Sequence, residues 1–156
     1  MKEVYGNEAI FGAGTITQEM DLKWLKEVGG EIAVSPHIDP NLVSTALDLG
    51  LFPVPGFYTP TEAFAAISSG AKVLKFFPAS SGGIGHYKAL KAVLPKEVKV
   101  LAVGGVQPSN IADWLEAGIS GFGIGSGFYR PGDSADMVKK RAHTFVESIR
   151  SYRETV

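Results

Sequence analysis

One lysine of the chain lies in an apolar stretch whose pattern predicts a β-strand. Residues 71–78 read AKVLKFFP, and their β-branched and aromatic side chains end at a proline that cannot continue a ladder. Because side chains alternate across a strand, Lys75 shares a face with Val73 and Phe77. Desolvation of an ammonium lowers its pKa and leaves an amine that can attack a carbonyl, which is typical of an imine-forming lysine. For the strand alone, a lysine with a buried stem and a solvated charge is the better interpretation.

Two glycine-rich turns follow the last two predicted strands of the chain, Gly104-Gly105 and Gly125-Ser126-Gly127. In (β/α)₈ barrels the loops after the seventh and eighth strands commonly hold a phosphate with backbone N–H groups. Each turn alone is equally consistent with a helix cap or a close-packing position. Two turns at consecutive strand ends, together with the Ser126 hydroxyl, favour phosphate binding. The chain has no dinucleotide-binding glycine fingerprint and no Walker lysine.

A few other polar residues are candidates for a site. Thr15 follows the first predicted strand, where it would bind a carboxylate or cap the next helix. His37, His86 and His143 are far apart in the chain; we expect His37 on the surface, His86 in a glycine-rich loop and His143 on the solvent side of the last helix. No metal site is expected, because a protein metal site of this kind needs clustered imidazoles and carboxylates. Arg130 is interpreted as a solvated loop arginine, with contact to an anionic substrate group as the alternative.

Composition bounds the class of protein. The chain has 156 residues, 45% of them apolar and 20% charged, which fits one ordinary globular domain. A net charge of −1 indicates neither a nucleic-acid partner nor an anionic membrane surface. The absence of cysteine excludes disulfides and thiolate chemistry. No apolar run has membrane-spanning length and the first residues lack the apolar core of a signal peptide, so we expect a cytoplasmic protein.

The elements that must position these residues alternate regularly between strand and helix. The predicted strands cover 9–13, 32–34, 51–56, 71–78, 98–103 and 119–124, and the predicted helices cover 17–28, 40–49, 60–69, 87–94, 107–117 and 134–151. Trp24, Leu25 and Val28 form the apolar stripe of the first of these helices. Strict alternation implies a parallel α/β sheet, either an open doubly wound sheet or part of a (β/α)₈ TIM barrel. Polar strand ends and the two glycine turns favour the barrel. Residues 1–156 are then a single partial barrel domain with strands three to eight of eight.

Several motifs together resemble the KDPG/KHG aldolase family. They are Gly12-Ala13-Gly14-Thr15, Val54-Pro55-Gly56-Phe57, Leu74-Lys75-Phe76-Phe77-Pro78, Val103-Gly104-Gly105-Val106 and Gly125-Ser126. They occur in the family's order across nearly all of the chain. Members of this family are class I aldolases that cleave 2-keto-3-deoxy-6-phospho sugar acids to pyruvate and glyceraldehyde 3-phosphate. Residues 59–64, 88–95 and 128–132, together with Val103, resemble the phosphogalactonate branch more than the phosphogluconate branch.

The resemblance implies a role for each site residue. Lys75 resembles the Schiff-base lysine, and Thr15 resembles the residue that holds the pyruvyl carboxylate. Pro55 and Phe77 resemble pocket walls. The phosphate site corresponds to Gly104, Gly105, Gly125 and Ser126. The implied partners are a phosphorylated keto-sugar acid, 2-dehydro-3-deoxy-6-phosphogalactonate or -gluconate, and pyruvate, with no cofactor.

The chain departs from the family pattern at its start. The family's first two βα units, which carry its acid/base glutamate and arginines at the carboxylate end, have no counterpart. We therefore expect a truncated or two-piece aldolase with impaired turnover. A phosphate-ligand binding module without chemistry and a structural barrel fragment are the alternatives. Because a partial barrel leaves strand edges unpaired, we also expect a homo-oligomer, either a trimer or a strand-exchanged assembly.

Overall fold

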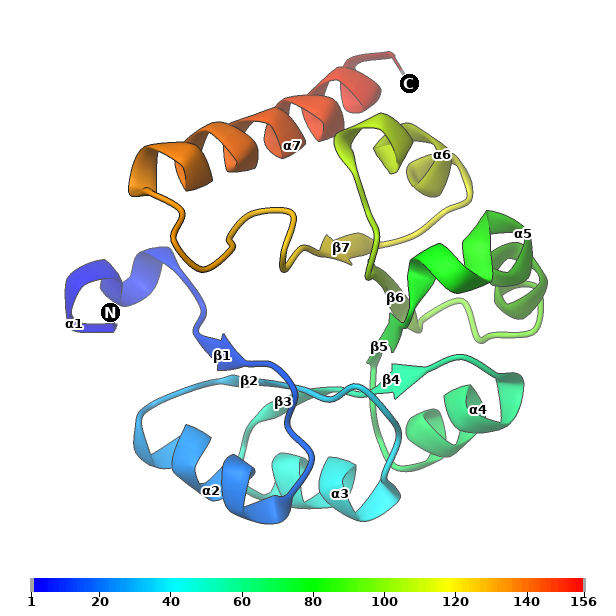
Figure 1. Cartoon of the computed structure of the whole chain (residues 1–156). Helices are drawn as coiled ribbons and strands as arrows, with labels where there is room; N and C mark the ends of the chain where they lie inside the picture. The colour runs from blue at the N-terminus through cyan, green and yellow to red at the C-terminus, as the bar shows by residue number, and fades with distance from the viewer. Residues whose placement is uncertain (1, 156) are drawn as a thin grey trace. The chain divides into compact units, whose positions relative to one another are not determined.

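The computed structural model describes residues 2–155, and the side chains of all of these except residues 2, 3, 7 and 155. Its strands are β1 (Gly12–Ala13), β2 (Ile32–Val34), β3 (Phe52–Val54), β4 (Gly56–Phe57), β5 (Val73–Phe76), β6 (Lys99–Val103) and β7 (Gly121–Gly123). Its helices are α1 (Lys2–Tyr5), α2 (Glu19–Glu27), α3 (Pro40–Asp48), α4 (Pro60–Ser68), α5 (Ala79–Lys91), α6 (Ile111–Glu116) and α7 (Ala135–Thr155), with 3₁₀ turns η1 (Gly6–Glu8) and η2 (Pro108–Asn110). Strands and helices alternate along the chain (Figure 1), which confirms the predicted α/β class.

The chain divides into two compact units. Residues 1–75 with 93–99 form the first unit, and residues 76–92 with 100–156 form the second. The boundary falls inside β5, between Lys75 and Phe76. The assignment of residues 1–156 to a single partial barrel domain stays a prediction.

The first unit contains a three-stranded parallel sheet in the order β1-β2-β3. Gly12 pairs with Ile32, and Ile32 pairs with Phe52 on its other side. Helices α2 and α3 lie along this sheet (Figure 1). The core that joins the sheet to its helices consists of Ile16, Leu22, Leu25, Ala33, Leu42, Ala46 and Leu51. Strand β4 and residues 73–75 of β5 also belong to this unit, and the two strands are neighbours in a second sheet.

Local capping signals fix where the helices of the first unit begin. The Asp39 carboxylate accepts a hydrogen bond from the Asn41 N–H at 2.9 Å, and Pro40 is the first residue of α3. In α4 the Glu62 carboxylate accepts from the Thr59 N–H at 2.8 Å, while the Thr59 side chain accepts from the Glu62 N–H. These side chains satisfy N–H groups that the first helical turn leaves unpaired. Both predicted helix starts are confirmed.

The second unit is built around a parallel pair, β6 and β7, with Leu101 opposite Gly121 and Val103 opposite Gly123. Its aromatic core packs Phe76 against Tyr87 and Trp114, with ring centroids 5.8 Å and 6.2 Å apart. The Tyr87 hydroxyl donates to the Gly118 carbonyl at 3.1 Å, and burial raises the pKa of Tyr87 to about 12. Helix α7 packs against α6 and η2.

Three local predictions are wrong. His86 lies in α5 rather than in a loop, because that helix begins at Ala79 and tolerates the glycines before His86, one of which, Gly83, kinks it. Of the predicted apolar stripe of Trp24, Leu25 and Val28, only Leu25 is buried; Trp24 and Val28 are 59% and 77% exposed. The buried face of α2 is formed by Leu22 and Leu25, which are three residues apart and therefore share one side of the helix.

Candidate active site

Lys75 lies on β5 with its side chain almost completely buried. The residue is 7% exposed, and Leu74 and Phe76 on either side of it are fully buried. Because neighbours along a strand face opposite ways, Lys75 is directed to the other side of the strand from these two. Its backbone N–H donates to the Pro55 carbonyl at 2.9 Å, which brings two of the predicted site residues together. Burial lowers the pKa of the Lys75 ammonium, in the direction expected from the sequence.

The lysine just before β5 offers a contrast. Lys72 lies three residues earlier and is exposed. An exposed ammonium keeps its hydration, whereas a buried one loses it. Of these two lysines, only Lys75 is in the environment that produces a nucleophilic amine.

Thr15 follows β1 and has a strained backbone. Its φ is 60°, and no other non-glycine residue between 2 and 155 has a positive φ. A β-branched residue in this conformation costs about 1–3 kcal/mol, and such strain is found preferentially at functional sites. Thr15 is exposed, and the sheet neighbour of its strand is β2. Its hydroxyl is therefore accessible at the end of a strand, as a substrate-binding residue requires.

A hollow of about 220 Å³ lies at the ends of β6 and β7 and collects the remaining predicted residues. We call it the glycine hollow; its wall includes Phe77, Gly104, Gly105, Gly125 and Ser126. Gly104 and Gly105 have φ of 91° and 75°, which other residues rarely adopt. A side chain at position 105 would also collide with Ser80. Glycine is thus required here both by the backbone conformation and by the lack of space.

Hydrogen bonds hold the Gly104-Gly105 turn in place. The Ser80 N–H, in the first turn of α5, donates to the Gly104 carbonyl at 3.0 Å. Asn110 donates from its side-chain amide to the Gly105 carbonyl at 3.4 Å and accepts from the Gln107 N–H at 3.0 Å. The carbonyls of the turn are thereby engaged on the protein side, so the turn keeps one shape beside the hollow. Sequence reasoning treated Gln107 only as a helix start; it also lines the hollow.

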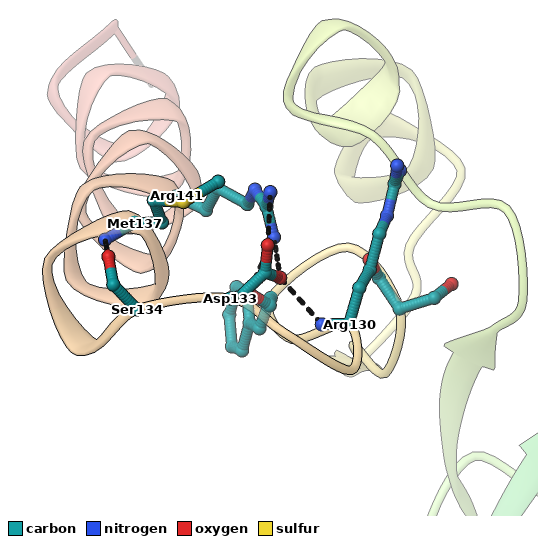
Figure 2. A network of polar contacts seen from close by, with 7 residues as sticks. Arg130, Asp133, Ser134, Met137 and Arg141 are labelled. Atoms are coloured by element: carbon teal, nitrogen blue, oxygen red, sulfur yellow. Dashed lines mark hydrogen bonds and ion pairs between the residues drawn. The ribbon is translucent and has the colours of Figure 1, made fainter.

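The loop from β7 to α7 is held by a network that the sequence did not predict (Figure 2). Arg141 on α7 donates to both carboxylate oxygens of Asp133, with Nη2 3.0 Å from Oδ1, and to the Phe128 carbonyl at 3.3 Å. The Arg130 N–H donates to Asp133 Oδ2 at 2.6 Å. The hydrogen bond from Arg141 keeps the pKa of the Asp133 carboxyl below its ordinary value. Asp133 and Arg141 lie eight residues apart across a loop–helix junction, where no sequence spacing predicts a contact.

The predicted site residues therefore fall into two groups. Thr15, Pro55 and Lys75 belong to the first unit, while Phe77 and the four residues of the two turns belong to the second. His143 is on the solvent side of α7 as predicted, and His37 is exposed as predicted. Among the side chains that the structure describes, no three His, Asp or Glu residues come together as metal ligands. None of the helices between residues 2 and 155 is both long and apolar enough to span a bilayer.

The repeating βα units define the fold class as a TIM-barrel-type α/β protein. The buried lysine on one strand and the glycine turns that end two later strands are typical of a lysine-dependent aldolase. Comparison with known proteins gives the family. The family model described as KDPG and KHG aldolase matches residues 1–144, and the chain belongs to this family.

Individual relatives agree with this membership. The chain is 42% identical to a 2-dehydro-3-deoxy-6-phosphogalactonate aldolase of Escherichia coli K12 over 99% of its own length and 74% of the relative's. It is 45% identical to a probable enzyme of the same name from Rhizobium meliloti, over 85% of this chain and 63% of that protein. A solved structure described as native KDPGal superposes with a TM-score of 0.95 at 40% identity, over 98% of this chain and 74% of the other. The chain thus spans about two thirds to three quarters of the length of these proteins.

Proposed function

We propose that the chain carries the imine-forming lysine and the phosphate site of an aldolase that cleaves 2-dehydro-3-deoxy-6-phosphogalactonate to pyruvate and glyceraldehyde 3-phosphate. The observation that carries the proposal is Lys75, a lysine 7% exposed with a lowered pKa in the strand motif of the family. A deprotonated amine is the form that attacks a carbonyl. Family membership and the names of the 42–45% identical relatives support the substrate.

The chemistry follows from a neutral Lys75 amine. Its Nζ adds to the C2 carbonyl of the sugar acid to give a carbinolamine, which loses water to form a protonated imine. The hydroxyl at C4 then loses its proton, the C3–C4 bond breaks, and its electron pair moves into an enamine while the aldehyde leaves. Protonation of the enamine at C3 and hydrolysis release pyruvate and the free amine. The imine serves as the electron sink that makes carbon–carbon cleavage accessible.

The other predicted residues receive binding roles in this proposal. Thr15 would donate its hydroxyl to the substrate carboxylate, and Pro55 and Phe77 would be apolar walls of the substrate site. Backbone N–H groups of the two glycine turns and the Ser126 hydroxyl would hold the phosphate. A Zymomonas mobilis 2-keto-3-deoxy-6-phosphogluconate aldolase, 28% identical with a TM-score of 0.79, was solved with 3-phosphoglycerate, a ligand of the same phosphate chemistry.

Reductive trapping tests the central step. Pyruvate and borohydride should add one reduced pyruvyl group to the chain, located at Lys75 by peptide mass spectrometry. Imine formation rather than cleavage is the appropriate readout, because it reports directly on the Lys75 amine. Lys72→Ala is the matched control and should trap normally. If Lys75→Ala traps as well as the unmodified chain, the proposal is wrong.

The alternative function, a phosphate-ligand binding module, gives the opposite pattern in the same experiment. Such a module would bind glycerol 3-phosphate through the glycine hollow but would trap no pyruvate. The epimer of the sugar acid is tested in the complete enzyme by the ratio of kcat/KM for phosphogalactonate and phosphogluconate substrates. We expect the galactonate epimer to be preferred, because the 42–45% identical relatives carry that name whereas a relative named KHG/KDPG aldolase is 33% identical.

We also propose that the protein is a cytoplasmic homo-oligomer, a trimer or a strand-exchanged assembly. Charged sugar phosphates stay in the compartment where they are made, which supports the cytoplasm. Met20, Trp24 and Val28 recur every four residues along α2 and are all exposed, and such an apolar line commonly marks a contact surface. Light scattering at micromolar concentration should show an oligomer that Trp24→Glu weakens, with Lys23→Glu as the control. A monomer would contradict the proposal.

A further inference from the structure

A second hollow of about 260 Å³ adjoins the glycine hollow within the second unit. We call it the arginine hollow; its wall consists of Gln107, Pro108, Ser126, Gly127, Arg130, Arg141, Thr144 and Phe145. Gln107, Ser126 and Gly127 line both hollows. The two spaces are therefore separated only by a shared wall that contains a residue proposed to bind phosphate.

The two hollows differ in charge. The wall of the glycine hollow contains no cationic side chain among the residues that the structure describes. A phosphate monoester dianion held there would receive only neutral N–H and O–H donors. Hydrogen bonds to charged donors are roughly twice as strong as those to neutral ones, and a guanidinium matches phosphate geometry particularly well. The missing cation is available on the other side of the shared wall.

The two arginines of the second hollow are not equivalent. Arg141 is balanced by the Asp133 carboxylate, which it binds through two nitrogens. Arg130 makes no ion pair with any described side chain; its guanidinium donates through Nε to the Ser126 carbonyl at 3.3 Å. Figure 2 shows the Arg130 side chain directed away from Asp133; the Asp133 carboxylate accepts from the Arg130 backbone N–H and not from its guanidinium. Arg130 therefore lies near the Asp133 carboxylate without forming an ion pair with it, and its terminal nitrogens remain available beside Ser126.

We propose that Arg130 is a specificity-determining residue that recognises the phosphate group of the substrate from the arginine hollow, across the wall formed by Ser126. The inference rests on the proposed function and names the group that would select phosphorylated over unphosphorylated sugar acids. Asp133 is a positioning residue here, because it fixes the Arg130 backbone and neutralises Arg141. The site takes a phosphate monoester dianion, and the pyruvyl end of the substrate does not depend on it.

Calorimetric titration with glycerol 3-phosphate tests the inference. Arg130→Gln should weaken binding by about tenfold, which is the loss expected for one charge-assisted hydrogen bond. Arg150→Gln is the matched control, because Arg150 is an exposed arginine of α7 that pairs with Glu147, and it should leave binding within twofold of the unmodified chain. Arg130→Lys, which keeps the charge and loses the planar fork, should bind with intermediate affinity. Thermal unfolding of each variant checks that the fold is intact.

The outcomes separate this inference from the function on which it rests. Binding by Arg130→Gln within twofold of the unmodified chain, or no glycerol 3-phosphate binding by the unmodified chain, would overturn the inference even if pyruvate trapping at Lys75 succeeds. Trapping that fails while Arg130→Gln still weakens phosphate binding would overturn the proposed aldolase chemistry and leave Arg130 as the phosphate residue. If Arg130→Gln does not fold, equal affinities for Arg130→Lys and the unmodified chain at several salt concentrations would refute the role of the guanidinium.

Discussion

The two units of the chain obtain their chemistry in opposite ways. The first unit buries a charged side chain, Lys75, and pays the desolvation cost on a regular strand. The second unit leaves N–H groups, a hydroxyl and the Arg130 guanidinium accessible in turns and a loop. Reactivity that comes from burial depends on the strand and its core, whereas anion binding depends on how loops are tied down. Changes in one unit should therefore affect one kind of chemistry and spare the other.

The largest expected effect comes from Lys75→Met, which removes the amine and keeps the volume. Pyruvate trapping should be abolished, and glycerol 3-phosphate binding should be unchanged. The free energy of unfolding at neutral pH should rise by about 1–2 kcal/mol, because a desolvated ammonium is replaced by an apolar group and active-site residues commonly cost stability. Urea denaturation measures the stability, with Lys72→Met as the control. Loss of phosphate binding in Lys75→Met would break the comparison between the two units.

The converse change is Gly105→Ala in the second unit. The new methyl group would collide with Ser80 at a backbone φ of 75°, so the turn must shift. We expect glycerol 3-phosphate binding to fall by tenfold or more, as about 1.4 kcal/mol corresponds to each factor of ten, while pyruvate trapping stays normal. Gly132→Ala is the matched control, since its φ is 91° but nothing lies within 4 Å of the added carbon. Equal losses in both variants would show that backbone strain alone is responsible.

A smaller effect is expected at Thr15, where the first unit stores backbone strain. Thr15→Gly should raise stability by about 1 kcal/mol, because glycine adopts a φ of 60° without the cost that threonine bears. The same change should raise the pyruvate concentration needed for half-maximal trapping, since the hydroxyl proposed to donate to the carboxylate is lost. Thr17→Gly, at a position without positive φ, should destabilise instead. If both variants lose stability, the positive φ of Thr15 does not lower the free energy of unfolding.

The smallest expected effect is the pH dependence of the loop network in the second unit. Asp133 has a lowered pKa in the folded chain, so its contribution to stability is present above the unfolded-state pKa of about 3.9 and is lost as pH falls through the folded value. Thermal unfolding measured from neutral to acidic pH should show this loss, and Asp133→Asn should flatten that part of the curve. If the thermal stability of Asp133→Asn falls with acidic pH as steeply as that of the unmodified chain, another group is responsible for the loss.

How much the sequence predicts differs between the two units in the same way. Strand and helix positions in the first unit follow local rules: Lys75 was identified from the alternation of side chains along its strand, and the helix starts at residues 40 and 60 were predicted correctly. The α2 surface was assigned wrongly because a helical period alone does not say which of two apolar faces, Leu22 with Leu25 or Trp24 with Val28, meets the sheet. In the second unit, helix α5 was predicted too short, because the tertiary bond from Ser80 to Gly104 offsets the low helix propensity of its glycines.

The glycine turns were predicted as a phosphate site, but their supports were not. The contacts of Asn110 with the Gly105 carbonyl and of Arg141 with Asp133 join segments that no spacing rule connects. Loops are shaped by such long-range contacts, which become visible only when the fold brings the segments together. Arg130 was recognised as a candidate, yet its hydrogen bond to the Ser126 carbonyl required the structure.

The chain has two tryptophans, and they occupy contrasting surroundings. Trp114 of the second unit is 4% exposed and packs against Tyr87, while Trp24 of the first unit is 59% exposed. The indole emission of Trp114 should therefore be blue-shifted and shielded from iodide, and that of Trp24 red-shifted and readily quenched. The variant Trp24→Phe would keep only the tryptophan of the second unit, and Trp114→Phe would keep only that of the first. Melting of the lysine-bearing and phosphate-binding units could then be followed optically and separately, without any attached label.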